Sequence, residues 1–181
     1  MLTDILQVYQ DQCLIYFSSC GIILENSMYY SHKRNMELLI QNNFKKYIIV
    51  RLPQVIGKSN NNSTLINFLF NSIKNNIKIQ LYNNATRYFI ETEDLVLIFK
   101  NLIENKNNYN KIHDIAIPIK YTIFEIVSTL EKILNINSDF EIVNGGVDYN
   151  LKLSTVENIL QNLNFVYNKS YLEKSILKSL L

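Results

Sequence analysis

The stretch "CLIYFSSCGIILENSMYYSHKRNMELLIQNNFKKYIIVRLP" (residues 13–53) decides the fold. It opens with a continuous apolar run that ends in small hydroxyl residues, which is typical of a buried parallel strand. Ser27 can then cap a helix over residues 28–41, and residues 45–57 read as the next buried strand, stopped by Pro53. Strand, helix and strand in this order predict a right-handed parallel crossover.

The alternation of strands and helices continues to the end of the chain. Alternating or apolar runs predict further strands, and apolar residues at helical spacing predict further helices. The sequence is therefore of the α/β class, with a parallel sheet. Expected strands lie at residues 77–82, 87–90, 111–118 and 139–144, and expected helices at 3–10, 63–76, 92–106, 122–134, 154–165 and 170–180.

Bulk composition excludes several classes of protein. The chain has 181 residues, 48% of them apolar, which is enough for a real core. A net charge of +2, with scattered basic residues, disfavours nucleic-acid binding. The two cysteines, Cys13 and Cys20, do not make a disulfide scaffold and suit a reducing compartment. With neither a membrane-spanning apolar run nor a signal peptide, we expect a cytoplasmic protein with no membrane partner.

Tyr29 and Lys33 form a YxxxK pattern at the start of the first long predicted helix. With 12 tyrosines and many lysines in the chain, about one such match is expected by chance, so the spacing alone carries no weight. Context changes this, because parallel sheets place functional groups at the carboxyl ends of their strands. The helix with Tyr29 and Lys33 lies between two such ends, "FSSC" (17–20) and "RLPQVIG" (51–57).

The order of these stretches resembles a known family. "YFSSC", "YYSHK" opening a helix, "IIVRLPQVIG", "RYFIETEDLV" and "KIHDIAIP" follow one another as in the extended short-chain dehydrogenases/reductases, the nucleotide-sugar epimerases, dehydratases and reductases. "LKLSTVENILQNLNF" is similar to that family's C-terminal segment. The resemblance implies the last strands of a Rossmann-like doubly wound sheet and a small C-terminal α/β substrate-binding region, divided as 1–58 and 59–181.

The resemblance also assigns the catalytic residues. It implies that Tyr29 is the acid/base for a sugar hydroxyl or carbonyl, and that Lys33 lowers the tyrosine pKa and holds a cofactor ribose. A free phenol has a pKa of about 10, so acid/base catalysis near neutral pH requires the tyrosine pKa to fall by roughly three units. In "FSSC", Ser19 is our choice for the catalytic hydroxyl. Cys20 could be a proton-transfer thiol in contact with substrate, although a buried structural cysteine is the more common reading.

Other binding residues come from the same match. Gln54, with Pro53 shaping its turn, falls where the family often places an amide facing the nicotinamide or the sugar diphosphate. Equally, the Gln54 amide can serve only to hydrogen-bond unpaired backbone groups at the end of the strand. Arg87 matches an arginine that grips the diphosphate, a use that suits a guanidinium fork. No cluster has metal-ligand spacing, so no metal is expected.

The glycine-rich turn of a dinucleotide-binding half is not found in the sequence. Gly21, Gly57, Gly145 and Gly146 do not lie between a first strand and helix. By the resemblance, the chain begins just before the fifth strand of the family's sheet, so binding of NAD or NADP by this chain alone is in doubt. The open strand edge is then expected to be covered by the N-terminal helix, by a homodimer partner or by a separate N-terminal half.

Two functions from different classes follow from the resemblance, and an unrelated α/β interaction domain is the third alternative. The first is an NAD(P)-dependent nucleotide-sugar epimerase, dehydratase or reductase, of the kind used in surface-polysaccharide biosynthesis. The second is a non-catalytic remnant that binds the sugar nucleotide or dimerises.

Overall fold

The structure is a computed structural model that describes residues 12–23, 27–59 and 61–180. The helix expected over residues 3–10 lies outside these ranges. The chain divides into two compact units. Unit 1 comprises residues 1–53, 95–115 and 151–164, and unit 2 comprises residues 54–94, 116–150 and 165–181. The chain thus passes between the units several times, and the expected division into 1–58 and 59–181 stays a prediction.

Unit 1 contains a three-stranded parallel sheet in the order β1-β2-β7. The strands are β1 (Leu14–Ser19), β2 (Tyr47–Leu52) and β7 (Lys111–Asp114). Helix α2 (Met28–Asn43) connects β1 to β2, and its N-cap Ser27 accepts a hydrogen bond from the Tyr30 N–H at 3.3 Å. The predicted parallel crossover is therefore confirmed.

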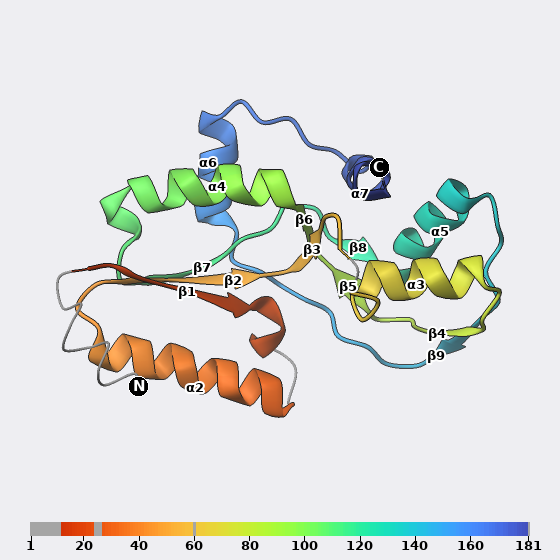
Figure 1. Ribbon diagram of the computed structural model, residues 1–181, viewed down its shortest axis with the longest axis horizontal. Coiled ribbons are helices and arrows are strands. Elements are labelled where there is room, and N and C mark those ends of the chain that lie inside the picture. The colour runs from red at the N-terminus through yellow and green to blue at the C-terminus, as the bar shows by residue number, and fades with distance from the viewer. Residues whose placement is uncertain (1–11, 24–26, 60, 181) are drawn as a thin grey trace. The chain divides into compact units, whose positions relative to one another are not determined.

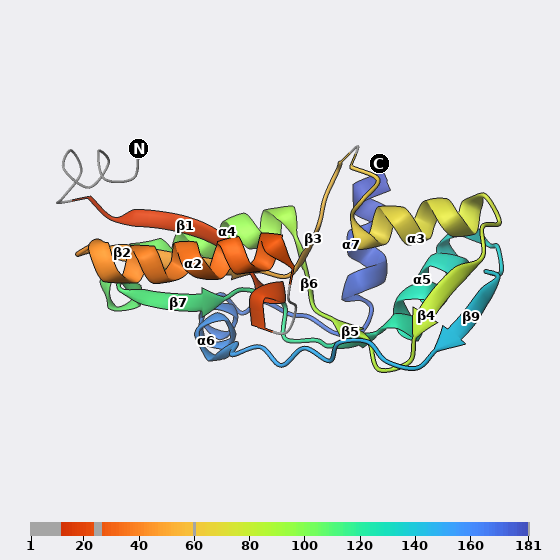
Figure 2. The same cartoon turned by 90° about the horizontal axis from the view of Figure 1, so that it is seen from below.

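Helices lie on both faces of this sheet (Figures 1 and 2). Helix α2 lies on one face and α4 (Thr92–Glu104) on the other. Because both faces are covered, β2 is apolar and buried at consecutive positions, and Ile48, Ile49 and Val50 have no solvent exposure. Unit 1 also contains the short 3₁₀ helices η1 (Cys20–Ile23) and η2 (Lys106–Asn108) and the helix α6 (Ser154–Asn162).

In the part of unit 2 that the structure describes, the elements are three strand pairs and three helices. The pairs are β3 (Gln54–Ile56) with β6 (Phe89–Glu91), β4 (Ile79–Tyr82) with β9 (Phe140–Val143), and β5 (Thr86–Arg87) with β8 (Tyr121–Thr122); the helices are α3 (Leu65–Lys74), α5 (Ile123–Leu134) and α7 (Tyr171–Leu180). The first two pairs are parallel and β5–β8 is antiparallel. The apolar core of unit 2 is formed by residues of α3, α5, α7 and the strands.

Several predicted strands are shorter than expected or are divided: the strands expected over 77–82 and 139–144 are trimmed to β4 and β9, and that over 87–90 is divided between β5 and β6. Residues 45–57 form two strands instead of one, because β2 ends at Leu52 and β3 starts only after Pro53, in a different sheet. Proline lacks the N–H that a ladder needs, so it divides the run. The strand expected over 111–118 ends at Asp114. In the described ranges, no helix is long and apolar enough to cross a membrane.

Candidate functional site

The end of β1 and the start of α2 lie side by side in unit 1. The Lys33 Nζ donates a hydrogen bond to the Phe17 carbonyl oxygen at 2.8 Å. It also lies 4.9 Å from the centre of the Tyr16 ring and 5.7 Å from the centre of the Tyr29 ring. A cation held over the face of an aromatic ring is attracted by the ring's quadrupole. The YxxxK pair therefore has the structural context that its spacing alone lacked.

Local sequence sets the position of Tyr29. The Ser27 cap fixes where α2 begins, and Tyr29 lies in its first turn, 56% exposed. Its ring makes an edge contact with Tyr30, with centres 5.1 Å apart. Tyr30 in turn lies against Gly21, where a Cβ would come within 2.4 Å of the Tyr30 ring. Only glycine leaves room for this approach, so Gly21 helps to orient the start of α2.

The three candidates in "FSSC" differ in their surroundings. Ser19 is half-buried, and its Oγ accepts a hydrogen bond from the Gly21 N–H at 3.2 Å. The Ser18 Oγ is buried and has no hydrogen-bond partner in the described structure. Cys20 is buried and its Sγ lies 3.4 Å from the Arg51 carbonyl oxygen, to which the thiol donates. Burial, and then the nearby Asp114 carboxylate, raise the pKa of the Cys20 thiol, which keeps it protonated at neutral pH.

A buried ion pair beside these residues was not predicted from the sequence. Glu37 is 3% exposed and accepts two hydrogen bonds from Arg51, at 3.0 and 2.7 Å. Asp114 lies 3.9 Å from the Arg51 guanidinium and also accepts the Lys152 N–H at 3.0 Å. The bidentate pair of Glu37 and Arg51 links α2 to β2. No local spacing pattern predicts this pair, because Glu37 and Arg51 lie on different elements.

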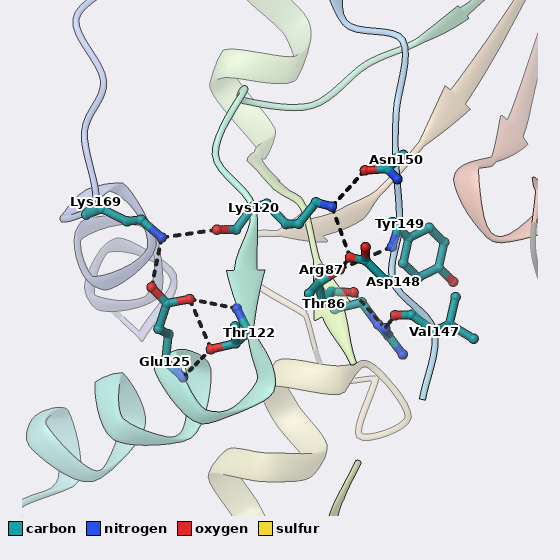
Figure 3. A network of polar contacts seen from close by, with 10 residues as sticks. All are labelled: Thr86, Arg87, Lys120, Thr122, Glu125, Val147, Asp148, Tyr149, Asn150 and Lys169. Atoms are coloured by element: carbon teal, nitrogen blue, oxygen red, sulfur yellow. Dashed lines mark hydrogen bonds and ion pairs between the residues drawn. The ribbon is translucent and has the colours of Figure 1, made fainter. Parts of the chain in front are cut away.

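Arg87 lies in unit 2, on β5. Its Nη1 donates to the Thr86 and Val147 carbonyl oxygens at 2.7 and 3.3 Å (Figure 3). The guanidinium lies 5.0 Å from the centre of the Tyr149 ring. Stacking on an aromatic ring holds the plane of an arginine while leaving other N–H donors for a ligand.

Strands β5 and β8 are fixed around Arg87 by a network of polar contacts (Figure 3). Asp148 accepts hydrogen bonds from the Thr86 hydroxyl at 2.6 Å and from Lys120 at 2.9 Å, and Lys120 also reaches Asn150 at 2.8 Å. The bond from Thr86, followed by that from Lys120, lowers the pKa of the Asp148 carboxyl. The segment carrying Val147 and Tyr149 is thereby held beside β5.

The predicted site residues fall in both units. Ser19, Cys20, Tyr29 and Lys33 all lie in unit 1, where the Lys33 ammonium is near the Tyr29 ring, and Pro53 follows the end of β2 in the same unit. Gln54 begins β3 and Arg87 lies on β5, both in unit 2. No group of three or more potential metal ligands occurs in the ranges that the structure describes.

No family model and no curated protein sequence matches the chain. Solved structures do match. One is the dTDP-glucose 4,6-dehydratase of Bacillus anthracis in complex with NAD, at 16% identity and a TM-score of 0.74, covering 98% of this chain. Another is a point variant of the UDP-glucuronic acid 4-epimerase of Bacillus cereus, with NAD and UDP-4-deoxy-4-fluoro-glucuronic acid, at 17% identity and a TM-score of 0.75, covering 97%.

A third similar structure is the UDP-N-acetylglucosamine 4-epimerase of Methanobrevibacter ruminantium in complex with UDP-N-acetylmuramic acid, at 15% identity and a TM-score of 0.72, covering 98% of this chain. The chain spans 64% of the length of each of these three structures. At these identities the likeness shows the fold. The chain has the mixed α/β, Rossmann-like fold of these nucleotide-sugar enzymes, and the predicted fold class is confirmed.

Proposed function

We propose that this chain is the reactive and sugar-nucleotide-binding part of an NAD-dependent nucleotide-sugar epimerase, dehydratase or reductase, with a place in surface-polysaccharide biosynthesis. The observation that carries the proposal is the position of Tyr29 and Lys33. They begin the helix that follows a parallel strand, and Lys33 bonds that strand's backbone at 2.8 Å. The fold shared with nucleotide-sugar epimerases and dehydratases supports it.

Each residue of unit 1 has a distinct part in the proposed reaction. The Tyr29 phenolate takes a proton from a sugar hydroxyl, or the Tyr29 phenol donates a proton to a carbonyl oxygen. The Lys33 ammonium stabilises the phenolate and binds a ribose hydroxyl, and Ser19 donates a hydrogen bond to the reacting oxygen. NAD, when bound, supplies hydride transfer at the sugar carbon. Because its thiol stays protonated, Cys20 serves as a structural hydrogen-bond donor and not as a base.

Sugar-nucleotide binding is assigned to unit 2. Arg87 offers its fork to the diphosphate, and Tyr149 holds the plane of the fork. Gln54, placed by Pro53, faces the nicotinamide or the diphosphate. We also propose that Lys33 and Pro53 contact the NAD cofactor.

The residues fit the nicotinamide end of the cofactor better than its pyrophosphate end. In the described residues, no glycine-rich turn joins a strand to a following helix. Gly21 lies in η1, Gly57 follows β3, and Gly145 and Gly146 follow β9. The backbone N–H groups that usually cradle a pyrophosphate are therefore not provided here. This observation favours the second function, a non-catalytic chain that binds the sugar nucleotide.

Two titrations distinguish the enzyme from the non-catalytic binding protein. The full chain is titrated with NADH, followed by nicotinamide fluorescence, and separately with UDP- and dTDP-sugars, followed by calorimetry. Saturable binding of both ligands is the result expected for the enzyme. Sugar-nucleotide binding without NADH binding supports the non-catalytic function, and binding of neither ligand at millimolar concentration contradicts the proposal.

A further inference from the structure

The sequence contains one Asn–Gly pair, Asn144 and Gly145, which directly follows β9. The backbone nitrogen of the residue after an asparagine can attack the asparagine side-chain amide, and glycine, which has no Cβ, hinders this attack least. Asn144 is exposed, and Gly145 has a φ of 125°, a conformation that residues with a side chain rarely adopt. Asn144 is therefore the asparagine of this chain that is most prone to the attack.

The Asn83 side chain, directly after β4, hydrogen-bonds both groups that would react. Its Nδ2 donates to the Asn144 Oδ1 at 3.0 Å, and its Oδ1 accepts the Gly145 N–H at 3.1 Å. For the attack, the Gly145 nitrogen must lose its proton and the Asn144 side chain must turn its carbonyl carbon toward that nitrogen. Both changes act against a hydrogen bond to Asn83, so Asn83 opposes the reaction.

The backbone on either side of Asn144 is held as well. Strands β4 and β9 lie side by side (Figures 1 and 2), and their hydrogen bonds continue past the strand ends. The Asn83 N–H donates to the Val143 carbonyl oxygen at 3.1 Å. The Asn84 N–H donates to the Gly145 carbonyl oxygen at 2.9 Å. These bonds limit the backbone rotation that would bring the Gly145 nitrogen to the side chain of Asn144.

We propose that Asn144 is a site of spontaneous deamidation, which Asn83 suppresses in the folded chain and which is released when the segments after β4 and β9 separate. The Gly145 nitrogen forms a bond to the Asn144 Cγ, and the bond between Cγ and Nδ2 breaks. The Nδ2 leaves as ammonia with the proton that the Gly145 nitrogen has lost, and a cyclic succinimide remains. Water then opens the ring at either of its carbonyl carbons and leaves aspartate or isoaspartate.

The products would alter the segment that holds Arg87. Asn144 lies in the same segment as Val147, whose carbonyl oxygen accepts a hydrogen bond from the Arg87 Nη1 at 3.3 Å. Aspartate adds a negative charge to this segment, and isoaspartate lengthens its backbone. Either change weakens the binding of a sugar nucleotide by Arg87, a consequence that rests on the function proposed above. Deamidation thus inactivates chains in which the two segments have come apart.

The test compares the folded full chain with the synthetic peptide acetyl-EIVNGGVDY-amide, which has the sequence of residues 141–149. Both are incubated near neutral pH, and conversion of Asn144 to an acid is followed by mass spectrometry of peptides. Asn83→Ala removes both side-chain bonds. Gln80→Ala is the matched control, because it removes another bond between β4 and β9, from Gln80 to Glu141 at 2.7 Å, and leaves Asn83 in place.

We expect Asn144 to deamidate at least about fivefold more slowly in the folded chain than in the peptide, a factor that two ordinary hydrogen bonds can supply. Asn83→Ala should raise the rate toward that of the peptide, and Gln80→Ala should leave it unchanged. Asn144→Gln should form no acid on the same timescale, because a glutamine side chain closes the ring far more slowly. Circular dichroism checks that each variant is folded. If Asn83→Ala does not fold, the folded chain and the same chain in urea are compared instead.

Three results would overturn the proposal. One is a rate in the folded chain that equals or exceeds the rate in the peptide or in urea. Another is a folded Asn83→Ala chain that deamidates as slowly as the native chain. The third is equal acceleration by Gln80→Ala, which would assign the protection to strand pairing and not to Asn83.

The effect on sugar-nucleotide binding is measured separately, by calorimetry of the native chain and of Asn144→Asp with UDP-glucuronic acid. Weaker binding by Asn144→Asp is the expected result. Equal binding by both chains contradicts the consequence for Arg87, and failure of the native chain to bind contradicts the proposed function. Neither outcome alters the deamidation rates, so the two failures can be distinguished.

Discussion

At the scale of single residues, Tyr29 is the group whose replacement is most informative. It is exposed at the start of α2, so Tyr29→Phe should leave the urea midpoint of unfolding unchanged. Turnover of UDP- or dTDP-sugars with NAD should fall by roughly 10²–10⁴-fold, because the proton donor and acceptor is lost. Unchanged turnover would remove Tyr29 from the reaction.

Glu37 carries the largest expected effect of one side chain on stability. It is buried, and its removal leaves the Arg51 guanidinium without its bidentate partner. Glu37→Ala should lower the free energy of unfolding by about 3–5 kcal/mol. The matched control is the exposed pair of Lys132 and Glu173, 2.8 Å apart, where Lys132→Ala should cost about 1 kcal/mol or less. Urea denaturation measures both, and equal losses would contradict a structural role for the buried pair.

At the scale of elements, the start of α5 is set by a capping box. The Thr122 hydroxyl accepts the Glu125 N–H at 3.2 Å, and the Glu125 carboxylate accepts the Thr122 N–H at 2.7 Å. Thr122→Ala should destabilise the chain by about 0.5–2 kcal/mol in urea denaturation. Thr129→Ala, at a half-buried position of the same helix, should cost less. A larger loss for Thr129→Ala would show that the cap does not set the stability of α5.

The same cap predicts a dependence on pH. Burial raises the pKa of Glu125, but hydrogen bonds from Lys169 and Thr122 outweigh it and leave the pKa below the ordinary 4.5. A lowered pKa contributes stability that is present above the unfolded pKa and is lost as pH falls through the folded pKa. The stability difference between the native chain and Glu125→Gln should therefore be largest near neutral pH and shrink in acid. A difference that grows in acid would contradict this assignment, and urea midpoints across the pH range measure it.

Most elements could be predicted from the sequence, because their signals are local. Ser27 caps α2 where the sequence places its start, and Thr64 and Thr122 cap α3 and α5, which begin within two residues of the expected starts. The positions of β1, β2 and β4 could be predicted from apolar runs, which are local signals as well. The break at Pro53 was read as the end of a strand, but the pairing of β3 with β6 depends on residues far apart in the chain, which no local pattern encodes.

At the scale of the whole molecule, the site was harder to predict than the fold. The spacing of Tyr29 and Lys33 is visible in the sequence, and the structure adds that Lys33 bonds the backbone of β1. The pair formed by Glu37 and Arg51 depends on how α2 packs against β2, so spacing alone could not show it. Gln54 and Arg87 lie in a different unit from Tyr29. Each unit is made of segments that alternate along the chain, so the composition of the sequence does not reveal the division.

The most direct test of the account is calorimetric titration of the full chain with UDP-glucuronic acid and dTDP-glucose, repeated with Arg87→Lys and Lys174→Ala. Arg87→Lys keeps the charge but removes the fork that a diphosphate requires. Circular dichroism confirms that each variant is folded. The account predicts saturable binding of at least one sugar nucleotide, weakened at least about tenfold in Arg87→Lys and unchanged in Lys174→Ala. Absence of binding at millimolar ligand, or equal binding by Arg87→Lys, would contradict it.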